Sequence, residues 1–260
     1  MATKTSILAT DRRDRILDMI REDGNVKVID LSRIFKVSEV TIRQDLEKLE
    51  MEGYIEREHG GAYLKNLGNQ VKSFSLQHRE NMEKKAKIGK KAIEYINEGD
   101  CIILDSGTTT TEIARNLTHY QNLTVITNAL NIALLLGAEP GINVIVTGGE
   151  FKAPTLSLTG EKGADSLKGL HADKLFLATA GISLKAGLTY PSLSDLVVKM
   201  AMIDSADVVY LVADSSKIGK SSLASLGAMS LMDYLITDKG IKEKDKQVFK
   251  EHEIEFIIAE

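Results

Sequence analysis

The sequence predicts an α/β protein in two parts: a small helical module with a β-hairpin, then a larger body built on a mainly parallel sheet. In the first 64 residues, apolar side chains recur every three or four positions and then give way to two short β-rich runs. From residue 101 onward, seven apolar runs alternate with helical stretches. That alternation is typical of a parallel sheet covered on both faces.

The composition is that of a globular protein in a reducing compartment. The 260 residues are 43% hydrophobic and 27% charged, and Cys101 is the only cysteine, so no disulfide can form within the chain. Residues 1–15 lack the apolar stretch of a signal peptide, and no segment approaches the roughly 18 apolar residues of a membrane span. We therefore expect a cytoplasmic protein with no membrane partner.

The net charge of −4 is unevenly distributed. Residues 1–72 carry 13 Lys or Arg and 13 Asp or Glu, whereas residues 73–92 carry 6 basic residues against 2 acidic ones. The remainder carries 14 basic residues against 22 acidic ones. The N-terminal 92 residues are thus neutral to basic, whereas the remainder is acidic. This distribution favours an N-terminal part that binds nucleic acid.

Three helices are predicted in the N-terminal module. The first stops at Gly24, the second covers residues 29–35, and the third follows Ser38, a residue type that caps helix N-termini, and ends at Gly53. The helical spacing gives their buried positions: Ile16, Leu17, Ile20, Ile42, Leu46 and Leu49.

The third helix presents a face suited to DNA. If its three apolar positions are buried, then at 100° per residue Val40, Gln44 and Glu47 point away from the core, with Thr41 and Arg43 beside them. A valine can meet a thymine methyl group in the major groove. Hydroxyl, guanidinium and amide groups can bond base edges or phosphates.

A β-hairpin follows this helix. Residues 54–58 and 62–64 bracket His59-Gly60-Gly61, which reads as a two-stranded wing with a glycine turn. Three helices plus a wing make a winged helix-turn-helix, so we predict a domain over residues 1–64 that binds double-stranded operator DNA. The alternative is a small protein-interaction module with a β-ribbon.

The segment VSEVTIRQDLEKLEMEGYIEREHGGAYL resembles the DNA-binding signature of DeoR-type bacterial regulators of sugar metabolism. In that signature, a Ser-x-x-Thr-Ile-Arg-x-Asp-Leu helix precedes an Arg-x-His-Gly-Gly-Ala wing. The resemblance implies that five of these residues face DNA, and helix geometry already places Thr41 and Arg43 there. The candidate DNA-binding residues are Ser38, Val40, Thr41, Arg43, Gln44, Arg57, His59 and Gly60.

Residues 65–72 have turn composition and are predicted to be a linker to a second domain, residues 73–260. This domain is expected to open with one long helix over residues 73–100, whose buried face carries Ile88, Ala92, Ile93 and Ile96. The basic cluster Lys84 to Lys91 fits a solvated face, a contact with the DNA backbone or a contact with an effector.

Small polar residues recur where the predicted strands of this domain end. They are Asp105-Ser106-Gly107, Thr127-Asn128, Gly148-Gly149, Ala180-Gly181, Asp214-Ser215 and Thr237-Asp238. In open α/β sheets these carboxyl ends converge on the ligand crevice. The first turn continues into four threonines and offers backbone N–H groups and hydroxyls to an anion, usually a phosphate. We expect the Lys217 ammonium to point toward the same phosphate.

DSGTTT, TN, TGG and ADSSK follow the order and spacing of the DeoR-type sensor domain. That domain resembles ribose-5-phosphate isomerase in fold and binds phosphorylated sugars or related metabolites. The likeness covers about residues 10–240, with departures at Ser194-Asp195 and at ATAGI, positions that would touch the sugar. The candidate effector-binding residues are Asp105, Ser106, Gly107, Thr108, Thr109, Thr127, Asn128, Gly148, Gly149, Gly181, Lys199, Asp214 and Lys217.

The main alternative is an isomerase-like enzyme fused to a DNA-binding module. Isomerisation needs a general base, and the candidates Asp105, Asp195 and Asp214 each have a structural role open to them, as a cap or a hydroxyl ligand. The five histidines show no metal-ligand spacing. VVYLVADSSKIGKSS comes close to a P-loop, but Asp214 stands where the first glycine belongs.

An architectural DNA protein would not account for a concave polar site. The sequence therefore predicts a transcriptional repressor of carbohydrate-metabolism genes that responds to a phosphorylated sugar. We expect a homo-oligomer, dimer or tetramer, with no catalytic residue, cofactor or metal.

Overall fold

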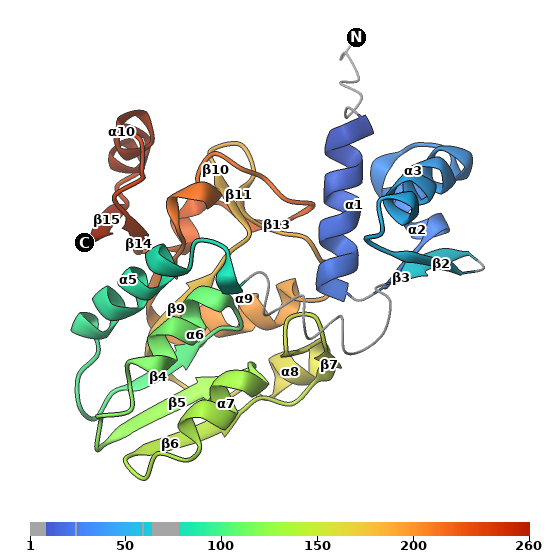
Figure 1. The fold of residues 1–260 in the computed structure, drawn as a ribbon. Helices are drawn as coiled ribbons and strands as arrows, with labels where there is room; N and C mark the ends of the chain where they lie inside the picture. Colours follow the sequence, from blue (N-terminus) through green and yellow to red (C-terminus); the bar gives the residue numbers. More distant parts are fainter. Residues whose placement is uncertain (1–8, 24, 59, 64–77) are drawn as a thin grey trace.

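The computed structural model describes residues 9–23, 25–58, 60–63 and 78–260 (Figure 1). The predicted linker and the position of His59 lie outside these residues. The three predicted N-terminal helices are present as α1 (Ala9–Asp23), α2 (Val28–Phe35) and α3 (Glu39–Met51). They bury a common core, in which Ile16, Ile20, Leu31, Ile42 and Leu46 are at most 1% exposed.

The wing is present and has one strand more than predicted. β2 (Glu56–Glu58) and β3 (Gly61–Tyr63) pair antiparallel, and β1 (Asn25–Lys27) pairs antiparallel with the other side of β3. Gly61 permits this third strand, because a Cβ atom there would lie 2.2 Å from the Val26 carbonyl oxygen.

The body contains one seven-stranded sheet, and its neighbouring strands are all parallel, as predicted. The strand order is β15-β14-β12-β9-β4-β5-β6. The bounds are β4 (Cys101–Leu104), β5 (Leu123–Thr127), β6 (Ile142–Val146), β9 (Ala172–Ala178), β12 (Ala206–Val212), β14 (Tyr234–Asp238) and β15 (Glu255–Ala259).

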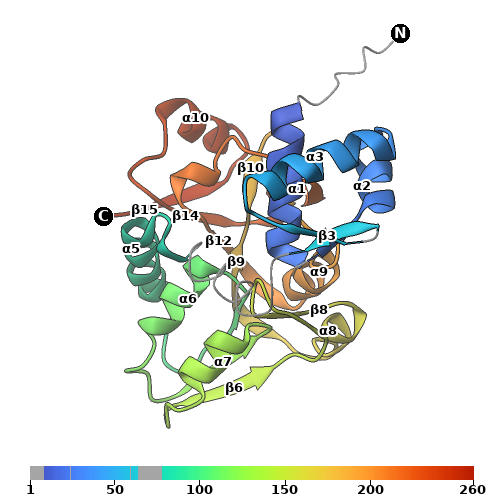
Figure 2. The ribbon, with the colours of Figure 1, turned by 45° about the vertical axis from the view of Figure 1, so that its right-hand side comes forward.

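Both faces of this sheet are covered. On one face lie α5 (Met82–Ala92), α6 (Thr108–Arg115) and α7 (Leu130–Leu136), which lie side by side in Figures 1 and 2. The other face packs against α9 (Leu196–Asp204), α10 (Glu243–Glu251) and a small antiparallel sheet of β10 (Gly181–Ser183), β11 (Gly187–Tyr190) and β13 (Ala224–Gly227). A short helix, α8 (Glu161–Asp165), packs on α9.

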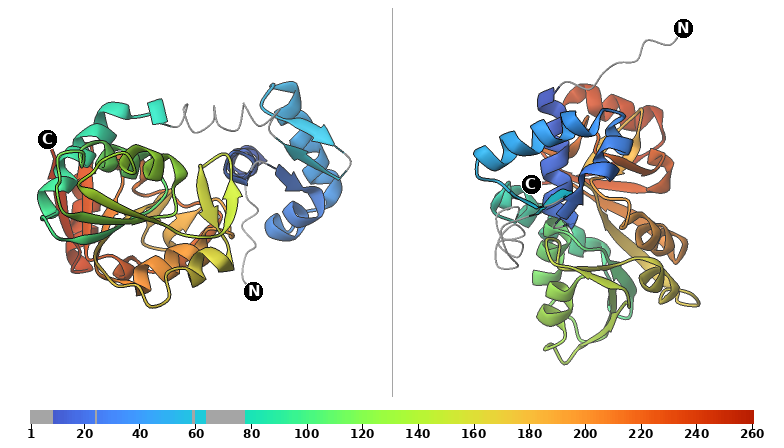
Figure 3. Two further views of the ribbon diagram at one scale, coloured as in Figure 1. Left: turned by 90° about the horizontal axis from the view of Figure 1, so that it is seen from below. Right: turned by 90° about the vertical axis from the view of Figure 1, so that its right-hand side faces the viewer.

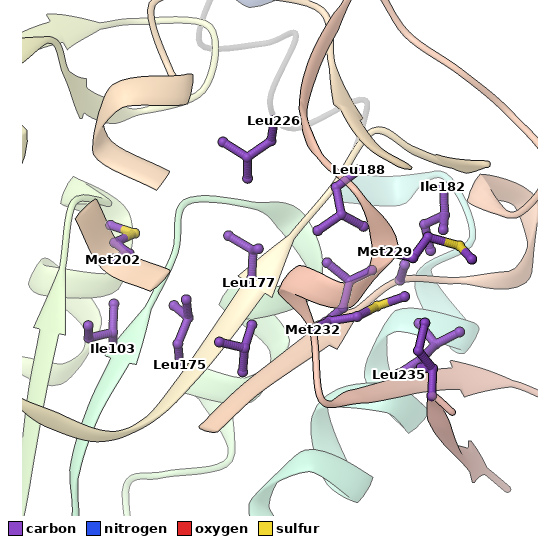
Figure 4. Close-up of a cluster of buried hydrophobic side chains, with 14 of the residues drawn as sticks. Ile103, Leu175, Leu177, Ile182, Leu188, Met202, Leu226, Met229, Met232 and Leu235 are labelled. Carbon is purple, nitrogen blue, oxygen red and sulfur yellow. The ribbon is translucent and has the colours of Figure 1, made fainter. Parts of the chain in front are cut away.

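The period-2 alternation of the strands divides the core into two clusters. In β4, Ile102 and Leu104 enter the cluster beneath α5 and α6, whereas Ile103 enters the opposite one. Figure 4 shows this second cluster, where Ile103 and Leu175 of the sheet lie near Met202 of α9.

The long helix predicted over residues 73–100 is shorter in the structure. α5 ends at Ala92 and continues as a 3-10 turn, Ile93–Tyr95, and residues 73–77 are not described. Asn81 precedes α5 in the left-handed conformation (φ 53°), which separates α5 from the helical residues 78–79. Ile88, Ala92 and Ile96 are buried as predicted, whereas Ile93 is only partly buried.

Two features of the body were not predicted. A hairpin of β7 (Glu150–Lys152) and β8 (Ser157–Thr159) follows β6. The side chain of Leu223 packs against the core of the N-terminal module. Figure 3, left, looks along α1, which lies between the body and the rest of the N-terminal module. Within the described ranges, no helix has both the length and the apolarity that a bilayer crossing requires.

Candidate functional site

The predicted DNA-facing surface is built on the start of α3. Ser38 caps this helix, because its Oγ accepts a hydrogen bond from the Thr41 N–H at 3.1 Å. The Val40 side chain is 60% exposed and Gln44 is exposed, as the helical spacing predicts. An exposed valine at the first turn can meet a thymine methyl group in the major groove.

The wing is clamped to this helix by Arg57. Its Nε lies 3.0 Å from Glu50 Oε2, and its Nη1 donates to the Arg43 carbonyl at 3.4 Å. Arg43 pairs in turn with Glu39 at 2.6 Å, yet its side chain stays 58% exposed. At the hairpin turn, Gly60 has a φ of +88°, which favours glycine. The orientation of α3 and the wing is thus fixed by the same side chains that were predicted to meet DNA.

A second polar site lies at the carboxyl ends of β4, β9 and β12. A cavity of about 120 Å³, called the recess below, opens there. Seven predicted residues line it: Ser106, Gly107, Thr108, Thr109, Lys199, Asp214 and Lys217. Further lining residues include Lys85, Thr155, Thr179 and Tyr190. The structure therefore brings together residues that are up to 132 positions apart, from Lys85 to Lys217.

The first turn of α6 forms one wall of the recess. The Thr111 N–H donates to the Gly107 carbonyl at 3.1 Å, and the N–H groups that precede it have no acceptor within the helix. A Cβ atom on Gly107 would lie 2.7 Å from Ala178 Cβ, so this turn and the end of β9 approach closely. Thr110, one of the four threonines of the predicted anion-binding turn, is fully buried, and its hydroxyl donates to the Gly107 carbonyl at 3.0 Å. Its hydroxyl is therefore engaged within the turn.

A buried ion pair lies beneath this turn. Asp105 accepts hydrogen bonds from Lys199 Nζ at 2.5 Å and from the Ala178 N–H at 3.1 Å. Its other oxygen accepts from the Ser106 N–H at 2.8 Å. Burial raises the pKa of Asp105 from its ordinary value, and the Lys199 ammonium opposes the rise. Asp105 thus acts as a structural anchor for the turn.

Asp214 lines the recess at the end of β12 and is 1% exposed. Its Oδ1 accepts from the Ser216 N–H at 2.9 Å and from Asn81 Nδ2 at 3.4 Å. Its Oδ2 has no hydrogen-bond partner among the residues that the structure describes. A buried carboxylate oxygen without a donor is costly, so it indicates a place for a hydroxyl or other donor from outside the protein.

Lys85 and Tyr190 are among the lining residues that the list of candidates lacked, although an effector contact was one alternative for the basic cluster Lys84 to Lys91. Lys85 is 4% exposed, and burial, followed by repulsion from Lys217, lowers its pKa. The spacing of Lys85, Ile88 and Ala92 places them on one helix face, which is the signal that could have identified Lys85. Tyr190 donates to the Ala178 carbonyl at 2.8 Å and carries Lys199 Nζ 4.7 Å above its ring centroid. Nothing in the sequence around Tyr190 indicates this role.

Other predicted residues lie behind the wall of the recess. The Thr127 hydroxyl donates to the Leu104 carbonyl at 2.7 Å, and Asn128 Oδ1 accepts from the Ser106 N–H at 2.9 Å. Gly148 and Gly149 are not among the lining residues of the recess. Gly149 instead lies close to β8, because a Cβ atom there would lie 2.5 Å from the Thr159 carbonyl oxygen. Gly181 sits one position beyond the lining residue Ala180. None of these five residues lines the recess itself.

The segment that approached the P-loop pattern has another structure. Residues Ser215–Lys217 form a 3-10 turn, and no helix follows Gly219 before β13 begins. A P-loop requires a helix there to hold the phosphates at its N-terminus. This segment is therefore not a P-loop.

Both sites lie in segments that match known protein domains. The DeoR-like helix-turn-helix domain matches residues 12–66, and the DeoR C-terminal sensor domain matches residues 80–239.

The chain belongs to the DeoR family of transcriptional regulators.

The transcriptional regulator GolR of Listeria innocua is 32% identical and covers 96% of this chain and 98% of its own. The transcriptional repressor GlcR of Bacillus subtilis is also 32% identical, with 96% of each chain covered. Like these DeoR-family relatives, the chain is a DNA-binding regulator and not an enzyme. Among solved structures, ribose-5-phosphate isomerase from Methanocaldococcus jannaschii overlaps with 53% of this chain and 55% of its own, at 16% identity and a TM-score of 0.40.

Proposed function

We propose that this DeoR-family protein represses carbohydrate-metabolism genes and that a phosphorylated sugar or related metabolite in the recess controls its operator binding. One observation carries the proposal. Residues at the start of α6, where the first N–H groups have no acceptor within the helix, line the same small cavity as Lys85 and Lys217. Backbone N–H groups at a helix N-terminus and lysine point charges are both used to bind phosphate.

The polar remainder of the recess suits a sugar. The free Oδ2 of Asp214 can accept a hydrogen bond from a ligand hydroxyl, and the Thr155 and Thr179 side chains line the same space. Lys199 attracts an anionic ligand less strongly than its position suggests, because its ammonium group already pairs with the Asp105 carboxylate. A phosphate on one end and hydroxyls on the other therefore match the distribution of donors and acceptors.

We further propose that the protein acts as a homo-oligomer, a dimer or a tetramer. A single α3 with one wing reads one short half-site, and duplicated half-sites multiply affinity. Operator DNA with two half-sites is the partner that such an arrangement would require.

A thermal-shift screen of the full chain with phosphorylated and unphosphorylated sugars tests the proposal. A ligand at a hundredfold excess over its Kd stabilises the folded state by about 2.7 kcal/mol, a shift of several degrees. We expect such a shift for at least one sugar phosphate and none for the matching free sugar. The same compound should change operator affinity, and equal responses to the phosphorylated and free sugars would contradict the proposal.

A further inference from the structure

A second, larger cavity opens from the recess toward the N-terminal module. This outer cavity has a volume of about 810 Å³ and shares Lys85, Thr108, Asp214 and Lys217 with the recess. Two of its lining residues, Asp18 and Arg21, come from α1. The helix that belongs to the DNA-binding module is therefore one wall of a space continuous with the effector site.

The two volumes indicate that the recess holds only part of a ligand. Small-molecule sites occupy about 300–1,000 Å³. The recess, at about 120 Å³, is small for a whole phosphorylated sugar, whereas the outer cavity has the usual size. A ligand whose phosphate lies against α6 would extend into the outer cavity and reach α1.

The outer cavity carries an excess of positive charge. Five basic side chains line it against three acidic ones, Asp18, Glu80 and Asp214. Within the described ranges of the chain, no carboxylate lies in ion-pair distance of Arg79, Lys217 or Lys220. Arg21 approaches Asp18 only at 3.6 Å, with both side chains partly exposed. Cations gathered around a cavity without matching carboxylates favour an anionic ligand.

We propose that the outer cavity binds a second anionic group of the effector, a carboxylate or a second phosphate, and that Arg21 of α1 contacts this group together with Arg79 and Lys220. The inference rests on the proposed function of the recess and extends it. A ligand held by both parts of the chain binds more tightly when α1 is docked against the body than when α1 has moved away. That difference in affinity is what couples the ligand to DNA binding.

Calorimetry on the full chain with matched pairs of probes tests this proposal. The pairs are glucose 6-phosphate with 6-phosphogluconate, and fructose 6-phosphate with fructose 1,6-bisphosphate, in which the second member adds one anionic group. In at least one pair, the doubly anionic member should bind about tenfold more tightly, the effect of one charge-assisted hydrogen bond.

Arg21→Ala should remove this preference, and Arg21→Lys should keep part of it. Arg15→Ala is the matched control, because Arg15 also lies on α1, pairs with Asp11 at 3.6 Å and does not line either cavity. Inorganic phosphate should bind Arg21→Ala as it binds the wild type, because phosphate alone fits in the recess. Unchanged operator affinity without ligand would show that the variant is folded.

The possible failures can be told apart. If none of the probes binds, both the proposed function and this inference are overturned. If sugar phosphates bind but the second anionic group adds no affinity, or if Arg21→Ala keeps the full preference, only the inference about the outer cavity is overturned.

Discussion

Lys84 Nζ donates a hydrogen bond to Ser215 Oγ at 2.9 Å and lies 3.3 Å from Asp238 Oδ2. Lys84 belongs to α5, the first long helix after the N-terminal module, whereas Ser215 belongs to the turn that carries Asp214 and Lys217. A ligand that moves this turn would therefore act directly on α5.

Lys84→Ala should weaken the response to effector without abolishing effector binding. The substitution removes the link between α5 and the turn, but Lys84 does not line the recess. We expect unchanged ligand affinity in calorimetry and a several-fold smaller change of operator affinity on adding ligand. Lys87→Ala, an exposed position on the same helix, is the control. A full response in Lys84→Ala would exclude this route of coupling.

Thr109→Ala should weaken effector binding directly. Thr109 is 7% exposed and lines the recess beside the free N–H groups of α6. Loss of one hydrogen bond to a charged group costs about 1.5–3 kcal/mol. Calorimetry should therefore show a Kd higher by roughly 10- to 100-fold. The control is Thr118→Ala, because Thr118 is exposed and lies beyond the end of α6, so this variant should bind the effector as the wild type does. If Thr109→Ala binds the effector as tightly as Thr118→Ala does, the phosphate lies elsewhere.

Arg57→Ala should reduce operator affinity more than its lost DNA contact alone would. Arg57 also holds the wing to α3 through Glu50 and the Arg43 carbonyl. A base contact is worth about 1–3 kcal/mol, and a phosphate contact less. Fluorescence anisotropy with labelled operator measures the change, and Lys168→Ala, an exposed lysine of the body, serves as the control. Unchanged affinity in both Arg57→Ala and Arg43→Ala would contradict the assignment of this surface.

The stability of the body should depend on the ionisation of Asp238. Burial would raise the pKa of this carboxyl, but the N–H groups of Ser215 and Gly240, the Ser215 hydroxyl and Lys84 outweigh burial and hold the pKa below its ordinary value of 3.8. The lowered pKa means that the folded state favours the carboxylate. This stabilisation is present above pH 3.8 and is lost as the pH falls through the folded-state pKa.

Asp238→Asn tests this dependence. The free energy of unfolding in urea should be lower in the variant than in the wild type at pH 7, and the difference should shrink as the pH falls below about 4. A difference that stays constant over this range would show that the charge of Asp238 does not contribute.

Much of the fold could be predicted because its signals are local. The central strands β4, β5 and β9 are largely buried, whereas the edge strands β6 and β15 are mostly only partly buried. All seven strands nevertheless appear in the sequence as short apolar runs. The predicted order of helices in the N-terminal module is likewise confirmed. β1 was missed because Asn25–Lys27 is three residues long and pairs only through the close approach of Gly61.

The site could be predicted only in part, for a physical reason. Polar turns at strand ends are visible in the sequence, and six of the residues found in or next to these turns line the recess, together with Lys199 of α9. Which partner each side chain finds depends on packing between distant segments. Asp105 meets Lys199, 94 positions away, and no local pattern indicates that pairing.

The most direct test of the account measures operator affinity of the wild type and Gly107→Val, each with and without a sugar phosphate that stabilises the wild type. A side chain at Gly107 would collide with Ala178 and fill the recess. No residue of the N-terminal module is among the neighbours that a Cβ atom at Gly107 would meet. We expect equal operator affinity for both proteins without ligand and a change on adding ligand in the wild type alone. A full response in Gly107→Val would contradict the claim that the recess at the start of α6 controls DNA binding.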